Sequence, residues 1–263
     1  MTNIKSVCEF LDQFAPTALA EDWDNVGLIL GDPTREASKI MTCLTVTPES
    51  AGEAIDQKVD LIVSHHPLPF SATKRITTDQ TPTRLIWELA RAGVSIYSPH
   101  TGFDSATEGI NQMLCDRLEI QSTDPIVPNR ANPEMPGAGR IGKLPAKTSL
   151  REFAQKVKDS FSLPRIQVVG DLDSSIQRIA TACGSGGAFL SKAASRGAEC
   201  LVTGEATFHS VLEARARKVG MVLMGHYFSE RFAIENLADR LAAEFSALNV
   251  WASKQECDPI RSI

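Results

Sequence analysis

An apolar run ends in two adjacent histidines and a proline where residues 60–67 read DLIVSHHP. Similar strand-like runs occupy residues 40–46 and 94–97, and helical patterns fill residues 49–57 and 83–92 between the runs. Strands that alternate with helices at this pace predict βαβ units and a mainly parallel sheet. The expected fold class is therefore α/β.

The two halves of the chain share a pattern of strand, helix and strand. Residues 40–66 form one such unit, and residues 179–205 form a similar one. In each half a further helix and strand follow, and these last strands end at His100 and His226. Open α/β sheets bind ligands just past the carboxyl ends of their strands. We therefore expect two similar lobes with a metal site between them.

A proline-rich segment separates the halves. Residues 121–140 contain four prolines, two asparagines and two glycines, and they predict a connecting segment. We expect a first lobe over residues 1–125 and a second over residues 126–225. Residues 226–263 are expected to hold the metal-ligand helix and a C-terminal strand that packs back on the first lobe. Ser105, with Glu108 three residues later, is typical of a capping box and predicts that a helix begins there.

The composition is that of an ordinary globular protein. The chain has 263 residues, of which 43% are hydrophobic and 22% are charged. The net charge of -5 gives no basic signature, which argues against a nucleic-acid partner. The sequence shows neither an apolar run of roughly 20 residues nor the apolar core of a signal peptide, so we expect a cytoplasmic protein without a membrane partner. The six cysteines are scattered, which favours reduced thiols.

Histidines and carboxylates gather at the predicted strand ends. His65 and His66 are adjacent, and His226 and Glu230 lie four residues apart at the start of a predicted helix. Imidazole and carboxylate together suit zinc, iron or manganese and do not suit calcium. Five ligands exceed what one open zinc site takes, and they fit two ions about 3.5–4 Å apart that share and activate a water. The expected ligands of this pair of divalent ions are His65, His66, Asp104, His226 and Glu230.

Three further residues are candidates for proton transfer. His100 lies four residues before Asp104 and could be a metal ligand, a proton relay or a partner that orients a ligand. Glu205 and His209 follow another predicted strand end, where residues 203–209 read TGEATFH. We expect that a metal-activated water attacks the substrate, with His100, Glu205 or His209 as general base or leaving-group acid.

Two other segments leave alternatives open. The acidic turn at residues 21–24 (EDWD) could bind metal or could be a solvated turn capped by its own side chains, and we favour the turn. The loop at residues 184–187 (GSGG) could hold a phosphate at a helix N-terminus. It could equally be a tight turn that lets a helix approach the sheet, and we favour this second interpretation.

Seven short motifs follow one another across nearly the whole chain. They are residues 23–28 (WDNVGL), 64–67 (SHHP), 100–104 (HTGFD), 137–142 (GAGRIG), 183–187 (CGSGG), 203–205 (TGE) and 225–230 (GHYFSE). Together they resemble the NIF-three-like dinuclear-metal-centre family, whose members are often named GTP cyclohydrolase I type 2 homologues.

This resemblance implies two interlinked three-layer α/β/α lobes and a toroidal homohexamer. It also implies a dinuclear centre held by the same five residues that the strand-end pattern selects. Longer members of the family insert an extra domain between the halves, for which residues 125–142 leave no room. The chain departs from the family at residues 44–47 (LTVT), where an aspartate is usual, and at residues 102–103 (GF), where an asparagine is usual. Both departures bear on the polarity of the pocket.

Two classes of function fit these features. The first is a metal-dependent hydrolase that acts on a nucleotide-like or phosphorylated small molecule. The second is a non-enzymatic, ring-shaped metal-binding protein with an interaction or regulatory role. A ring that threads nucleic acid is a third and weaker idea, because the charge balance is acidic.

Overall fold

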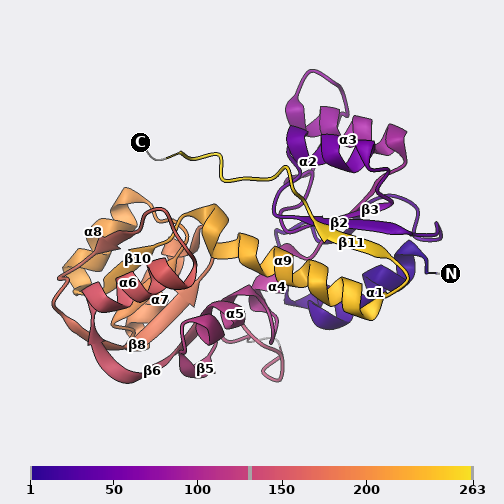
Figure 1. Cartoon of the computed structure of the whole chain (residues 1–263). Coiled ribbons are helices and arrows are strands. Elements are labelled where there is room, and N and C mark those ends of the chain that lie inside the picture. Colours follow the sequence, from indigo (N-terminus) through magenta and orange to yellow (C-terminus); the bar gives the residue numbers. More distant parts are fainter. Residues whose placement is uncertain (1, 130–131, 262–263) are drawn as a thin grey trace. The chain divides into compact units, whose positions relative to one another are not determined.

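The computed structural model describes residues 2–129 and 132–261 (Figure 1). Within these residues the chain forms two compact units. The first unit runs to Phe103 and is completed by Arg231–Cys257, and the second comprises Asp104–Glu230 and residues 258–261. The boundaries fall inside two helices, α4 (His100–Ser105) and α9 (His226–Glu244).

The first unit is built on a sheet with the strand order β1-β4-β3-β2-β11. Its strands are β1 (Gly27–Leu30), β2 (Lys39–Cys43), β3 (Leu61–Ser64), β4 (Ser95–Ser98) and β11 (Asn249–Ala252). Strands β11, β2, β3 and β4 run parallel, and β1 runs antiparallel to β4. Every residue of β3 (LIVS) and β4 (SIYS) is buried, which explains why neither sequence alternates between apolar and charged residues.

Helices cover both faces of this sheet (Figure 1). The helices are α1 (Ile4–Phe14), the short 3₁₀ helix η1 (Thr17–Leu19), α2 (Pro48–Asp56), α3 (Thr81–Ala92) and the greater part of α9. Residues such as Met41, Ile62 and Ile96 pack with α2 and α3 in one core. On the other face, the Thr42 hydroxyl donates to the Ile234 carbonyl of α9 over 2.9 Å. The unit is therefore a three-layer sandwich.

The second unit contains a sheet with the order β5-β6-β8-β9-β10-β7. Its strands are β5 (Gln121–Asp124), β6 (Arg140–Ser149), β7 (Gln167–Val169), β8 (Ser175–Ala182), β9 (Cys200–Thr203) and β10 (Gly220–Leu223). Strands β8, β9 and β10 are parallel, and the flanking strands are antiparallel. The α/β fold class is confirmed, with parallel strands at the centre of each sheet.

Helices also pack on both faces of the second sheet. They are α5 (Ile110–Arg117), α6 (Leu150–Ser160), the 3₁₀ helix η2 (Gly186–Phe189), α7 (Leu190–Ser195) and α8 (Phe208–Arg217). Ala180 and Ala182 of β8 lie in a core with α7 and α8. Thr181, which points to the opposite face, donates a hydrogen bond to the Asn111 carbonyl of α5 over 3.3 Å.

The repeat expected from the sequence is present in the topology. In the first unit, β2-α2-β3-α3-β4 lays down three neighbouring parallel strands, and β8-α7-β9-α8-β10 does the same in the second. Each third strand is flanked by an antiparallel strand that precedes the repeat in sequence, β1 beside β4 and β7 beside β10. His100 follows β4 and His226 follows β10, so each unit carries a histidine at the equivalent strand end.

Two expectations about local structure were wrong. The segment 121–140 is not wholly a connection, because β5 begins at Gln121 and pairs with β6. The predicted capping box at Ser105 does not start a helix, since Ser105 ends α4 and α5 begins at Ile110 with Gly109 as its N-cap.

Among the described residues, no helix combines the length and the apolar character needed to cross a membrane.

Candidate metal centre

The backbone of the first unit fixes the two adjacent histidines beyond β3. The His65 amide donates to the Cys43 carbonyl over 3.0 Å, and the His66 amide donates to the Leu44 carbonyl over 2.9 Å. These bonds extend the pairing of β2 and β3 past the strand ends. The Ser98 hydroxyl also donates to the His65 carbonyl over 2.6 Å. The backbone positions of both histidines are therefore set by the sheet.

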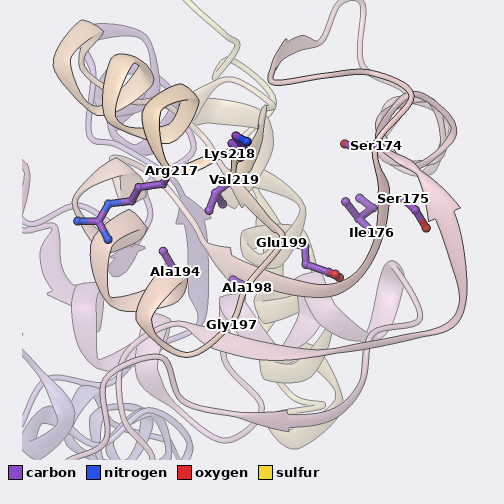
Figure 2. A pocket seen from close by; sticks show the side chains of 10 residues that line it. All are labelled: Ser174, Ser175, Ile176, Ala194, Gly197, Ala198, Glu199, Arg217, Lys218 and Val219. Atoms are coloured by element: carbon purple, nitrogen blue, oxygen red, sulfur yellow. The ribbon is translucent and has the colours of Figure 1, made fainter.

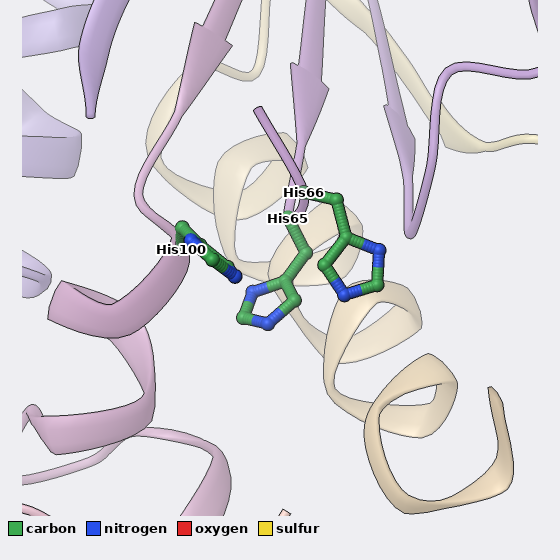
Figure 3. Close-up of side chains that lie close together, drawn as sticks. All are labelled: His65, His66 and His100. Atoms are coloured by element: carbon green, nitrogen blue, oxygen red, sulfur yellow. The ribbon is translucent and has the colours of Figure 1, made fainter. Parts of the chain in front are cut away.

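His100 joins this pair from the end of β4. One ligand atom from each of His65, His66 and His100 lies within 4.8 Å of the other two (Figure 3). The backbone of His100 has φ of 26°, a conformation that L side chains adopt at an energetic cost and that gathers at functional sites. Three imidazole nitrogens at this spacing fit a divalent transition metal.

The Asp24 carboxylate holds His100 in place. Asp24 Oδ1 lies 2.7 Å from His100 Nδ1, and Asp24 Oδ2 accepts from the Thr101 amide over 3.1 Å and from the Thr101 hydroxyl. Burial works against ionisation here, but the hydrogen bonds from His100 and Thr101 outweigh it and lower the pKa of Asp24 to about 2. The acidic turn thus orients a histidine through one of its carboxylates.

His66 is oriented by a hydroxyl. Thr45 Oγ1 lies 2.7 Å from His66 Nδ1, which leaves Nε2 as the nitrogen for a ligand. Thr45 is itself held by Glu256, whose carboxylate accepts from the Leu44 and Thr45 amides over 2.8 and 2.7 Å. Burial raises the pKa of Glu256, although these amides oppose the effect. Residues far apart in the sequence thus support one imidazole.

In the second unit, His226 lies between two carboxylates at the start of α9. His226 Nε2 is 3.1 Å from Glu230 Oε2, one helical turn away, and His226 Nδ1 is 3.0 Å from Glu205 Oε1. The hydrogen bond to Glu230 raises the pKa of His226 to about 9, with Glu205 adding to the effect and burial opposing it. The Ser185 hydroxyl donates to Glu205 over 2.5 Å and, together with His226, lowers the pKa of Glu205.

The glycine-rich loop packs against these candidate ligands. A Cβ atom on Gly184 would lie 2.2 Å from Glu230 Oε1, and the φ of Gly184 is +57°. The Cys183 amide donates to Asn111 Oδ1 and the Gly184 amide donates to Ser229 Oγ, over 2.9 and 3.0 Å. A Cβ atom on Gly186 would lie 2.6 Å from the Ala182 Cβ, so the glycines let this loop approach the sheet closely, which supports the interpretation as a tight turn.

Asp104 borders the same loop. The Cys183 thiol donates to Asp104 Oδ1 over 3.1 Å, and the Asn111 side chain donates to the Asp104 carbonyl over 3.1 Å. Burial, with the nearby carboxylates of Asp104 and Glu230, raises the pKa of the Cys183 thiol well above its ordinary value. The thiol therefore stays protonated and acts as a donor to a candidate ligand.

The structure groups the candidate residues by unit. It brings His65, His66 and His100 together in the first, and it joins Glu205, His226 and Glu230 in the second. His209 lies exposed in α8, where its ring contacts that of Phe208 at 6.2 Å, and it takes no part in the Glu205–His226–Glu230 contacts described here. The supporting residues that sequence reasoning missed are Asp24, Thr45, Cys183, Ser185 and Glu256.

A surface pocket in the second unit lies elsewhere. It has a volume of about 480 Å³ and is lined by residues that include Ser175, Glu199 and Lys218 (Figure 2). Ser175 begins β8, and Glu199 directly precedes β9, so the pocket lies at the amino ends of the parallel strands. The candidate ligands follow the carboxyl ends, which is the edge where α/β sheets bind ligands. The pocket is therefore separate from the candidate site.

The sequence is similar to curated proteins over nearly its full length. It is 29% identical over 263 residues to a protein of Clostridium acetobutylicum named GTP cyclohydrolase 1 type 2 homolog, with 98% of each chain covered. It is 35% identical over 260 residues to a protein of Schizosaccharomyces pombe named Protein NIF3 homolog, with 93% of this chain and 92% of the relative covered.

Solved structures share the fold. The Staphylococcus aureus protein SA1388 superposes with a TM-score of 0.88 at 26% identity, covering 100% of this chain and 99% of the other. A Bacillus cereus protein related to NIF3 gives a TM-score of 0.90 at 22% identity, with the same coverage. The family model for Duf34/NIF3 (NGG1p interacting factor 3) matches residues 2–259. The chain therefore belongs to the Duf34/NIF3 family.

Proposed function

We propose that this protein binds two divalent metal ions and hydrolyses a nucleotide-like or phosphorylated small molecule. The observation that carries the proposal is the convergence of His65, His66 and His100 in the first unit, with one nitrogen atom of each within 4.8 Å of the others. Of these, His65 and His66 are proposed as ligands and His100 as the residue that moves protons beside them. His65 and His100 are buried and His66 is half-buried, so their nitrogen atoms face one another inside the protein and not in open solvent. The proposed ligands of the metal pair are His65, His66, Asp104, His226 and Glu230.

The donor set fits this assignment. Imidazole nitrogens and carboxylate oxygens are the donors that zinc, iron and manganese accept in proteins. Glu230 is buried and already bonded to His226, so a cation would meet a preassembled pair of donors. When bound, a pair of such ions lowers the pKa of a coordinated water and so supplies a nucleophile near neutral pH.

The remaining residues orient ligands and move protons. His100 is the proposed proton acceptor, because Asp24 holds its Nδ1 and leaves Nε2 toward the other imidazoles. Glu205 is a positioning residue in this scheme, since its carboxylate is bonded to His226 and Ser185. Of the three candidates for proton transfer, His209 is then the proposed acid that protonates the leaving group, and it lies exposed on α8.

The test combines metal content with hydrolysis. Elemental analysis of purified protein should find about two divalent ions per chain, and His65→Ala should lower that content. Metal-loaded protein should hydrolyse at least one member of a panel of nucleotides and phosphoesters, and His65→Ala should reduce the rate at least 100-fold. Equal rates for the two proteins, or one ion per chain, would contradict the proposal. Glu235→Gln, an exposed change farther along α9, is the control.

A non-enzymatic interaction protein is the alternative. Phe208 and Leu212 lie one turn apart on α8 and are 72% and 43% exposed, which leaves an apolar face on that helix. Under this alternative, metal-loaded protein hydrolyses nothing in the panel. Phe208→Ser would then lower the molar mass measured by light scattering while metal content stays the same. The homohexamer implied by resemblance is tested by the same mass measurement.

A further inference from the structure

Two large aromatic side chains lie exposed beside the histidine cluster of the first unit. Trp23 is 58% exposed and Phe70 is 53% exposed, and their ring centroids are 5.9 Å apart. Both rings also contact His100, at 6.0 and 5.7 Å. The His100 ring in turn lies 5.1 Å from that of His65 and 5.5 Å from that of His66. An aromatic surface is therefore continuous with the imidazoles that Figure 3 shows.

The two loops that carry these rings are fixed to the rest of the unit. The Asn25 side chain, two residues after Trp23, donates to the Pro69 carbonyl, next to Phe70, over 2.8 Å. The turn before Trp23 is attached to α4, because the Glu21 amide donates to the Thr101 hydroxyl over 3.0 Å. Asp24 adds its bonds to His100 and Thr101. The rings are thus held in place before any ligand arrives, which reduces the entropy lost on binding.

The size of the patch identifies the kind of occupant. Two aromatic side chains of 150–250 Å² each, about half exposed, offer roughly 200 Å² of apolar surface. A stable interface between proteins buries about 800 Å² on each partner. The patch alone is therefore too small for a second copy of the chain, and it matches the face of one planar ring system.

We propose that Trp23 and Phe70 form a stacking site for the planar heteroaromatic ring of the substrate, with the polar end of the substrate toward His65, His66 and His100. This inference rests on the proposed function and narrows its substrate class to molecules that carry such a ring. Aromatic side chains stack on bases of any identity, so the site selects for a ring and tolerates differences between bases.

The test compares ligands with and without a ring. The dissociation constants of the four nucleoside 5′-monophosphates AMP, GMP, CMP and UMP and of ribose 5-phosphate are measured by calorimetry with the full-length, metal-loaded protein. At least one nucleotide should bind about tenfold more tightly than ribose 5-phosphate. Trp23→Leu and Phe70→Leu should each remove most of this difference and leave the affinity for ribose 5-phosphate unchanged. Trp23→Phe should retain most of it.

The matched control is Trp87→Leu. Trp87 is 47% exposed on α3, in the same unit, and should have no effect on either ligand. The proposal is overturned if none of the nucleotides binds more tightly than ribose 5-phosphate, or if the leucine variants weaken both ligands equally. It is also overturned if Trp23→Leu lowers the molar mass in light scattering, because the patch would then be an interface between copies.

The outcome is separable from that of the proposed function. Measuring metal content and phosphoester hydrolysis on the same samples distinguishes the two. One outcome is that the protein has no hydrolytic activity but prefers nucleotides, and that Trp23→Leu loses this preference. This outcome would support the stacking site and contradict the proposed hydrolase. The opposite outcome is that the protein hydrolyses ring-free phosphoesters and nucleotides at the same rate, and that Trp23→Leu leaves both rates unchanged. This outcome would support the hydrolase and contradict the stacking site.

Discussion

In the first unit the clustered side chains are three imidazoles, whereas in the second unit two carboxylates accompany one imidazole. His66 is oriented by the neutral hydroxyl of Thr45, while His226 lies between Glu205 and Glu230. The hydrogen bond to Glu230, with Glu205 adding to it, raises the pKa of His226 to about 9. In the metal-free protein the His226 imidazole therefore carries a proton at neutral pH. The cluster of the first unit therefore offers nitrogen donors alone, and that of the second also offers carboxylate oxygens. Metal affinity should depend more strongly on the second unit.

Glu230→Gln should have the largest effect. The change keeps the size of the side chain and removes a buried negative charge that is bonded to His226. We expect metal affinity to fall about 100-fold, or about 2.8 kcal/mol, measured by competition with a chromophoric chelator. His65→Ala should lower affinity less than this. Equal losses in the two variants would break the contrast between the units, and Glu235→Gln again serves as the control.

Gly184→Ala should damage the second unit through its packing. The new methyl group would lie 2.2 Å from Glu230 Oε1 at a backbone position with φ of +57°. We expect a loss of about 2 kcal/mol in the free energy of unfolding, because both the ligand and the backbone must shift. Gly52→Ala is the control, since a Cβ there meets nothing within 4 Å and the residue lies in α2. That change should stabilise by about 0.5–1 kcal/mol. Similar losses in both variants would show that crowding at Glu230 is not the cause.

Asp24→Asn should change how stability depends on pH. The pKa of Asp24 is lowered from 3.8 to about 2 on folding, so its ionised form stabilises the native state above pH 4. This contribution, about 1–2 kcal/mol after allowance for solvent screening, is lost as the pH falls from 4 to 2. Urea unfolding at pH 7 should therefore show the variant to be less stable, and the two proteins should converge near pH 2. A difference that persists at pH 2 would contradict this account of the pair with His100.

Thr45→Val should have the smallest effect of the four. The valine keeps the shape of the side chain and removes the partner of His66 Nδ1. Loss of a residue that orients a metal ligand typically weakens metal binding about tenfold, and Thr45→Ser should restore it. Nitrogen-15 NMR of the metal-free proteins should show a changed balance of the two His66 tautomers in Thr45→Val. The balance should be the same in Thr45→Ser as in the parent protein. Glu205→Gln is the matched variant in the second unit, and it should weaken metal binding more than Thr45→Val does. A smaller loss of metal affinity in Glu205→Gln would show that metal binding does not depend more strongly on the second unit.

The sequence predicted the parts of the fold that follow from local pattern. The parallel strands β2, β3 and β4 are short apolar runs between helices with clear spacing, and all were expected. The repeat in the second unit was expected for the same reason. Strand β5 was missed because Gln121–Asp124 is polar and mostly exposed at the edge of its sheet, so it lacks the apolar signal of a strand. The start of α5 was placed too early because the Ser105–Glu108 pattern looks like a helix start. In the structure Ser105 is instead the last residue of α4, a short helix that residues 100–104 gave no sign of.

The candidate site shows the same division. Histidines at strand ends were visible in the sequence, and the three of the first unit do converge. The residues that hold them were not visible, because Asp24 lies 76 positions from His100 and Glu256 lies 211 positions from Thr45. Such contacts depend on tertiary packing. For Asp24, only its place in the acidic turn gave a hint, and the turn interpretation did not identify His100 as its partner.

The pairing of β11 with β2 sets the order in which the chain can fold as it leaves the ribosome. Strand β2 can pair with β3 early, but its other edge gains a partner only when Asn249–Ala252 has been synthesised. The Leu44 and Thr45 amides likewise gain the Glu256 carboxylate late. The second unit draws on Asp104–Glu230, nearly all one continuous segment, and its sheet can form while synthesis continues. The first unit needs contacts about 200 residues apart, which are slow to close. The support that Glu256 gives to the loop beside His66 is therefore completed last, after nearly all of the chain has been synthesised.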